Sequence, residues 1–234
     1  MTTIKQRMLK NFDGRLHWLI PALCALTAGC IEGENKGHDT FDESPMGVSR
    51  SSVDDLTNDP AGAIALARRE KDHFFRGPDS PLKKGRGTFV GLRYYPYDPA
   101  YRVVGTFVPH DPPAKQILST STGTSRPMLM IGTIRFTIDS VDETLNAYVS
   151  AVEERRLFIP FRDRTSGGAT YGAGRYLEVM TDEMPGTQTD ILLDFNEAFN
   201  PYCAYNEEYS CPLVPNDNIL EIAIPAGEQT YTHD

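Results

Sequence analysis

Apolar residues follow a helical spacing in one stretch of the chain. That stretch begins at Asp59 or Asn58, which are suited to an N-cap, and continues with Pro60, which is suited to a first helical turn. Its apolar face is formed by Ala63, Leu66, Ala67 and Phe74, and its outer face by Arg68, Arg69, Glu70 and Lys71. The pattern predicts a single amphipathic helix over roughly 60–75, ending before Gly77-Pro78.

Beyond residue 87 the pattern changes to short runs of β-branched, aromatic and aliphatic residues, separated by Gly, Pro, Asn and Asp. Runs of this kind at roughly ten-residue spacing predict strands joined by turns. Eight or nine strands are expected, within 88–95, 101–108, 128–138, 145–152, 157–161, 176–180, 191–195 and 219–224. Since only one helix accompanies them, we predict a mainly β fold: an antiparallel β-sandwich or barrel-like domain with one N-terminal amphipathic helix.

The N-terminus has the features of an export signal. Basic residues precede an apolar run from Trp18 to Ala28, which ends at Gly29-Cys30. This run is too short to span a bilayer, which takes about 20 apolar residues, but it suits the hydrophobic region of a signal peptide. Small residues before a cysteine resemble a bacterial lipobox, although Thr27 stands where that motif usually has Leu. We predict a lipoprotein-type signal peptide over 1–29 and lipidation at Cys30; an ordinary cleaved signal peptide and a buried helix are the alternatives.

The residues after this signal predict how the rest of the chain is divided. Gly, Ser, Pro and acidic residues without apolar periodicity indicate a flexible polar tether over 30–57. A single globular β-rich domain is expected over 58–229, with a C-terminal tail over 230–234. Ile31, rather than Asp, follows the cysteine. In a Gram-negative bacterium this favours a lipid-anchored protein of the cell envelope, on the outer membrane and facing the periplasm.

Charge and motifs exclude several classes of protein. The chain carries 23 Lys and Arg against 32 Asp and Glu, a formal net charge of -9. Nucleic-acid binders use a clustered basic surface, so no nucleic-acid partner is expected. The sequence contains no phosphate-binding loop, no His-Glu-x-x-His zinc motif and no Gly-x-Ser-x-Gly nucleophile elbow. We therefore expect no metal and no cofactor.

Two segments are unusually rich in polar side chains: Leu157 to Leu177, and Asp194 to Tyr205 continuing through Cys211-Pro-Leu. The most specific runs within them are Phe161 to Tyr176 and Asn200-Pro-Tyr-Cys-Ala-Tyr205. Together with Arg69-Glu-Lys-Asp72, Ser80-Pro-Leu82 and Phe89-Val-Gly-Leu92, they resemble a prokaryotic family known as domain-of-unknown-function family 1684 (DUF1684). The resemblance covers about 68–228. It implies that these polar positions are features of the family, and it implies no reaction, because none is established for the family.

The polar side chains of these segments are the candidate site. They would converge if the segments end neighbouring strands, and an Arg facing carboxylates and amides either binds a small anion or locks loops together. The candidate ligand-binding residues are Asp163, Thr165, Tyr171, Arg175, Asp194, Asn196, Asn200 and Tyr205. In a hydrolase, Asp163 or Asp194 would be the general acid or base and Arg175 the stabiliser of an oxyanion.

Cys203 and Cys211 allow three interpretations. In an exported protein the default is a disulfide that closes a short loop and stabilises the fold by up to ~3 kcal/mol. A metal site is a second possibility, although the spacing is longer than that of the common zinc pairs and no His is nearby. A reactive or simply buried thiol is the third.

The sequence as a whole predicts a membrane-tethered envelope lipoprotein. Its β-rich domain would bind a small ligand or an envelope partner through the polar cluster. Two alternatives stay open: a hydrolase that uses Asp163 or Asp194 with Arg175, and a purely structural envelope protein.

Overall fold

The computed structural model of the chain describes residues 59–82, 86–150, 153–181 and 185–232. The predicted signal peptide, the lipidation site and the tether lie outside these residues. Within the described ranges, no helix is long and apolar enough to cross a membrane. The elements are α1 (Pro60–Arg76), η2 (Pro99–Tyr101), β1 (Arg102–Ser119), β2 (Ser125–Ile138), β3 (Val141–Ser150), β4 (Glu153–Phe161), β5 (Arg175–Met180), β6 (Thr189–Asp194), η3 (Phe195–Glu197), η4 (Tyr202–Ala204) and η5 (Asn216–Asn218).

Helix α1 begins where the sequence predicts. The carboxylate of Asp59 accepts a hydrogen bond from the backbone N–H of Gly62 at 2.9 Å, and Pro60 occupies the first turn. The prediction for the outer face is wrong at Lys71, which is buried together with Ile64 and Phe75. These three residues are spaced by seven and four positions, so they lie on one stripe of the helix.

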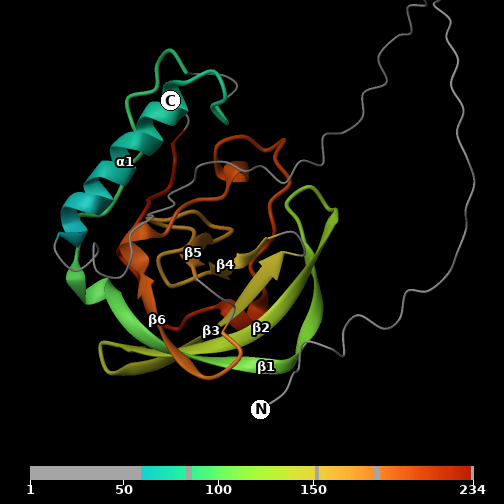
Figure 1. The fold of residues 1–234 in the computed structure, drawn as a ribbon. Helices are drawn as coiled ribbons and strands as arrows, with labels where there is room; N and C mark the ends of the chain where they lie inside the picture. Colours follow the sequence, from blue (N-terminus) through green and yellow to red (C-terminus); the bar gives the residue numbers. More distant parts are fainter. Residues whose placement is uncertain (1–58, 83–85, 151–152, 182–184, 233–234) are drawn as a thin grey trace, which may run out of the picture. The chain divides into compact units, whose positions relative to one another are not determined.

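The strands form one antiparallel sheet in the order β5-β4-β3-β2-β1-β6. The sheet curls into a half-barrel (Figure 1). Its two ends are linked by a short bridge, in which Tyr176 of β5 and Phe199, shortly after β6, exchange backbone hydrogen bonds of 2.9 and 3.0 Å. The mainly β prediction with one helix is confirmed, and the described residues form a single curled sheet rather than the two layers of a sandwich.

Two predicted strands are absent from this sheet. Residues 88–95 run beside α1, where the backbone N–H of Leu92 donates to the Asp72 carboxylate at 2.9 Å instead of to a neighbouring strand. Residues 219–224 form only an isolated bridge at Ile219. The prediction of strands in these segments is wrong because their backbone pairs only at isolated bridges, at Tyr94 and Ile219, and side chains satisfy part of the rest.

The main core lies inside the curl of the sheet. Ile134, Phe136 and Ile138 alternate along β2 with more exposed residues, and all three are buried. The concave side is closed by Leu220, Ile224 and Ala226 of the C-terminal segment. A second apolar cluster joins α1 to the loops after β6; it consists of Phe75, Leu82, Tyr202, Tyr205 and Cys211. The fold therefore depends on the C-terminal segment being held over the open side of the sheet.

Candidate functional site

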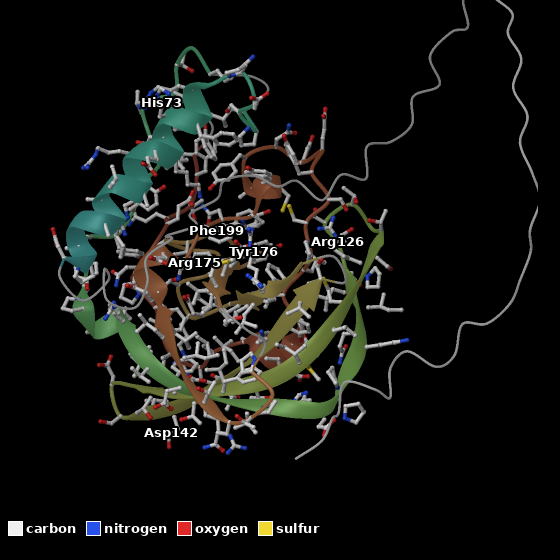
Figure 2. All side chains as sticks on the ribbon, in the orientation of Figure 1. His73, Arg126, Asp142, Arg175, Tyr176 and Phe199 are labelled. Atoms are coloured by element: carbon white, nitrogen blue, oxygen red, sulfur yellow. The ribbon has the colours of Figure 1, made fainter. Side chains whose placement is uncertain are left out.

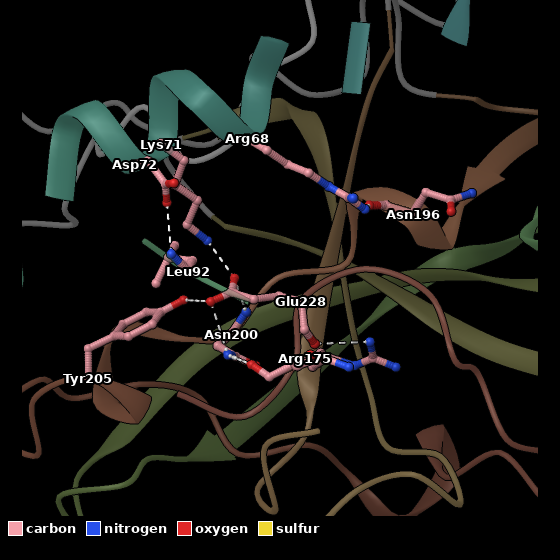
Figure 3. A network of polar contacts seen from close by, with 10 residues as sticks. Arg68, Lys71, Asp72, Leu92, Arg175, Asn196, Asn200, Tyr205 and Glu228 are labelled. Atoms are coloured by element: carbon pink, nitrogen blue, oxygen red, sulfur yellow. Dashed lines mark hydrogen bonds and ion pairs between the residues drawn. The ribbon is translucent and has the colours of Figure 1, made fainter. Parts of the chain in front are cut away.

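A buried carboxylate, Glu228, connects α1 to the C-terminal segment (Figure 3). The Lys71 Nζ donates to its Oε2 at 2.7 Å, which forms an ion pair, and both side chains are less than a tenth exposed. Asn200 donates its backbone N–H at 3.2 Å and its side-chain amide at 3.1 Å to the same carboxylate. The hydroxyl of Tyr205 is a further donor. We call Lys71, Asn200, Tyr205 and Glu228 the Glu228 cluster.

Arg175 holds the same segment from the sheet side. Its guanidinium donates to the carbonyl oxygens of Ile224 at 2.9 Å and Glu228 at 3.3 Å, and also to that of Ala226. The side chain is 1 % exposed and its charge is balanced by Asp163 at 2.6 Å. Figure 2 shows Arg175 in the interior beside the ends of the strands. Because its acceptors are all protein groups, this guanidinium stabilises the fold by joining β5 to the C-terminal segment.

Both carboxylate oxygens of Asp163 also have protein partners. One carboxylate oxygen pairs with Arg175, and the other accepts the backbone N–H of Thr165 at 2.6 Å together with the Thr165 hydroxyl. The Thr165 hydroxyl lies 2.8 Å from that of Thr170. The structure thus brings Asp163, Thr165 and Arg175 together as predicted, but as a buried network in which each group is already hydrogen-bonded.

Asp194 and Asn196 form a separate group at the end of β6. Asp194 caps η3 by accepting both the backbone N–H and the side-chain amide of Asn196, at 3.0 and 2.9 Å. Asn196 also exchanges hydrogen bonds with the backbone of Asp98 at 2.8 and 2.9 Å. Arg102 lies 3.4 Å from the Asp194 carboxylate. Burial raises the pKa of Asp194, and its hydrogen bonds with Asn196 oppose that shift.

A cavity of about 40 Å³ lies between α1 and the segment after β6. Its lining is part apolar and part charged: Ile64, Ala67, Arg68, Lys71, Tyr94, Asn196, Glu197, Ala198 and Phe199. A water molecule needs about 10–15 Å³ on this measure, so the cavity accepts a few waters or a chemical group of a few heavy atoms. Of the predicted ligand-binding residues, only Asn196 lines it.

Arg68 is one of the two cations that line this cavity, together with Lys71. Its guanidinium donates to the carbonyl oxygens of Tyr95 at 2.8 Å and Asn196 at 3.1 Å, and it stacks over the Tyr94 ring at 4.5 Å. Among the described residues, no carboxylate forms an ion pair with it. Burial lowers the pKa of Arg68, yet an arginine stays protonated at neutral pH. The Asp194 and Glu228 carboxylates attract the charge of Arg68 from a distance, but within the described part of the chain neither of them contacts it directly.

Two buried polar atoms beside the cavity lack a hydrogen-bond partner, the Nε of Arg68 and the hydroxyl of Tyr94. Leaving a buried donor unpaired costs about 1–3 kcal/mol. A ligand oxygen that accepted from one of them would recover part of that cost.

Glu197 gives the cavity a titratable acid. Burial, and secondarily the nearby Asp194 carboxylate, raises the pKa of Glu197 from 4.5 to about 7, against the attraction of Arg102. At pH 6 most of the carboxyl is therefore neutral, whereas at pH 8 it is ionised. The charge of this carboxyl, which lines the same cavity as Arg68, thus changes between pH 6 and pH 8.

The remaining predicted residues, Tyr171, Cys203 and Cys211, lie elsewhere. The hydroxyl of Tyr171 is 3.8 Å from the Sγ of Cys203. The backbone N–H of Cys203 donates to the Sγ of Cys211 at 3.2 Å, and both side chains are free thiols in the structure. The predicted disulfide stays a prediction, with its two partners adjacent.

The structure divides the predicted cluster and adds residues that the sequence analysis missed. Asn200 and Tyr205 join Glu228, while Asp163 joins Arg175. The missed members are Arg68, Lys71, Glu197 and Glu228. For Lys71 a signal existed, because it continues the apolar stripe of α1. Glu228 had no local signal, because it follows Ala-Gly in a segment without periodicity.

The buried pair yields a prediction for stability. Replacing Asp163→Asn leaves Arg175 buried without its counter-charge, so we expect the free energy of unfolding to fall by about 3 kcal/mol. The matched control is Glu221→Gln, which breaks the exposed pair of Glu221 with Arg164; it is expected to cost less than about 0.5 kcal/mol. Denaturant unfolding measures both, and equal stability of the two variants would contradict a structural role for Asp163.

Glu197 yields a prediction for pH dependence. Because its pKa is higher in the folded protein, the stability it contributes is fully present below pH 4.5 and is lost as the pH rises through about 7. Between pH 5 and 8 we expect the native chain to lose on the order of 2 kcal/mol more than the Glu197→Gln variant. Thermal or denaturant unfolding across this range tests it; parallel curves for the two proteins would show that Glu197 does not titrate in this way.

Comparison with known proteins places this geometry in a family. The model for "Protein of unknown function (DUF1684)" matches residues 87–229. A search of the curated proteins finds no match. Among solved structures, the solution NMR structure of an uncharacterized protein from gene locus rrnAC0354 of Haloarcula marismortui is similar, with 40% identity and a TM-score of 0.62 over 76% of this chain and 97% of that one. The chain belongs to the DUF1684 family.

Proposed function

We propose that the protein is a membrane-tethered binding module. Its domain binds the negatively charged group of a small anionic molecule in the cavity beside Arg68. The observation that carries this proposal is a cavity lined by an arginine without a carboxylate partner among the described residues. Next to it lie two buried polar atoms without hydrogen-bond partners. The cavity has a volume of about 40 Å³, which is enough for one charged group of a ligand but not for a whole drug-sized molecule.

The lining indicates the chemistry of that ligand. Arg68 offers a positive charge, and the Tyr94 hydroxyl offers a hydrogen-bond donor. Ile64, Ala198 and Phe199 offer apolar contact. A carboxylate attached to a short apolar chain matches this combination, because guanidinium–carboxylate pairing is among the stronger polar interactions and the chain would cover apolar surface.

The Lys71 ammonium is less suited to a ligand, because Glu228 already balances its charge. Glu197 is the residue that would regulate binding. Its carboxyl, with a pKa of about 7, is neutral at lower pH and would repel a bound carboxylate once ionised. Affinity for an anion is therefore expected to be higher at pH 6 than at pH 8.

The tether belongs to the same proposal. The lipobox-like sequence ending at Cys30 and the polar stretch over 30–57 support an envelope lipoprotein held to a membrane by lipid alone. The relative from Haloarcula marismortui matches over 97% of its own length and covers 76% of this chain. This supports a domain that folds on its own.

The hydrolase alternative gains no support from the geometry. Asp163 and Arg175 have side chains that are 0% and 1% exposed, and they pair with each other and with backbone groups. A catalytic acid or base must reach the substrate within hydrogen-bonding distance. A protein partner in the envelope, or a purely structural role, has no specific observation in its favour.

Ligand binding can be tested with short carboxylates. Acetate, propionate and butyrate are titrated against the protein by NMR or thermal shift, with butyramide as a neutral control. We expect the carboxylates to bind and the amide not to. Tyr94→Phe removes one unpaired hydroxyl and is expected to weaken binding threefold to tenfold, about the value of one hydrogen bond. Arg68→Gln is expected to abolish it.

The matched control is Tyr97→Phe, since Tyr97 does not line the cavity; its affinity should equal that of the native chain. The proposal fails if none of the carboxylates binds. It also fails if Tyr94→Phe and Arg68→Gln bind as well as Tyr97→Phe, because binding would then lie elsewhere.

Membrane tethering can be tested by intact mass. Protein extracted from membranes of an expressing bacterium should have the mass of the chain from Cys30 with added acyl groups. Cys30→Ala should abolish the acylation and leave the protein unprocessed or released from the membrane. A mature chain that begins at another residue and lacks acyl groups would contradict the lipoprotein proposal without affecting the cavity.

A further inference from the structure

The two thiols lie close together although they are eight positions apart in the chain. Cys203 belongs to η4, and its backbone N–H donates to the Sγ of Cys211 at 3.2 Å. Cys211 is bound to the turn after β1: its backbone N–H donates to the Ser121 hydroxyl at 3.0 Å, and its carbonyl accepts the Ser121 N–H at 2.9 Å. None of these residues lines the cavity beside Arg68. The pair is therefore a separate feature of the fold.

The two thiols have different surroundings. Cys203 is partly exposed, while Cys211 is buried. The Tyr171 hydroxyl lies 3.8 Å from the Cys203 sulfur. Hydrogen bonds from the Cys211 thiol, and also from the hydroxyls of Ser121 and Tyr171, lower the pKa of Cys203 to about 6, against the effect of burial. The same pairing with Cys203 and burial raise the pKa of Cys211.

A partly exposed cysteine with a hydroxyl near its sulfur, next to a buried second thiol, is an arrangement suited to disulfide exchange. The thiolate is the attacking species, and hydrogen bonds to sulfur favour it. The buried thiol is protected from outside reagents but lies close enough to attack its neighbour. A metal site is less well supplied, because no group of three or more metal-binding side chains occurs among the described residues.

We propose that Cys203 and Cys211 form a thiol–disulfide exchange site for disulfides of small thiols, with Cys203 as the nucleophile and Cys211 as the resolving thiol. The Cys203 thiolate attacks one sulfur of the substrate, breaking its S–S bond and releasing the first small thiolate. Cys211 then loses its proton and attacks the Cys203 sulfur, which releases the second small thiolate. The protein dithiol is oxidised to a disulfide, and one substrate disulfide is reduced to two thiols, which take up the two protons.

The test uses the full-length chain with Cys24→Ser and Cys30→Ser, so that Cys203 and Cys211 are its only thiols. Reduced protein is mixed with oxidised glutathione at pH 7, quenched with acid and weighed by mass spectrometry. With both thiols present we expect the internal disulfide and no lasting adduct. With Cys211→Ser we expect a stable mixed disulfide on Cys203. With Cys203→Ser we expect reaction at least about tenfold slower, because Cys211 has little thiolate.

Tyr171 is a positioning residue in this proposal. Tyr171→Phe should move the pH midpoint of Cys203 alkylation upward and slow the exchange, whereas Tyr97→Phe should change neither. Equal reaction rates in the two single-cysteine variants would overturn the assignment of roles. A pair that is isolated as a disulfide and resists every ratio of reduced to oxidised glutathione would overturn the proposal in favour of a permanent structural disulfide.

Discussion

The buried ion pair between Lys71 and Glu228 is the interaction on which the arrangement of this domain depends. It joins α1, near the start of the described chain, to a segment near its end, across 157 positions of sequence. The C-terminal segment belongs to none of the strands of the sheet, and both backbone hydrogen bonds and buried side chains hold it over the open side of the curled sheet. The Glu228 carboxylate binds α1 through Lys71, while Arg175 binds the segment's carbonyl groups from the sheet side.

Burying these charges is costly, and the structure compensates by saturating them. The Glu228 carboxylate accepts from Lys71, Asn200 and Tyr205, and the Asp163 carboxylate accepts from Arg175 and Thr165. Removing one partner from such a network destabilises the fold far more than replacing the whole network by apolar side chains, because it leaves a buried charge unpaired. Arg68 has carbonyl partners, and among the described residues no carboxylate forms an ion pair with it.

Local patterns in the sequence predicted the local structure well. Asp59, Pro60 and the apolar spacing fixed the position of α1, and short β-branched runs located the six strands that pair in the sheet. The polar motifs also predicted membership of the DUF1684 family, which the family model confirms. The prediction failed where pairing depends on distant residues: Lys71 was assigned to solvent because its partner lies at the other end of the chain. Residues 219–224 were assigned to a strand because their apolar pattern does not reveal that Arg175 binds the Ile224 carbonyl.

The central claim is that Lys71 and Glu228 act as one unit that fastens α1 to the C-terminal segment. A double-mutant cycle with Lys71→Met, Glu228→Gln and the combination, followed by denaturant unfolding, tests it most directly. The account predicts that each single variant loses about 3 kcal/mol and that the double variant loses little more than either, which is a coupling of about 2 kcal/mol or greater. Additive losses would contradict it, because the two side chains would then stabilise the fold independently.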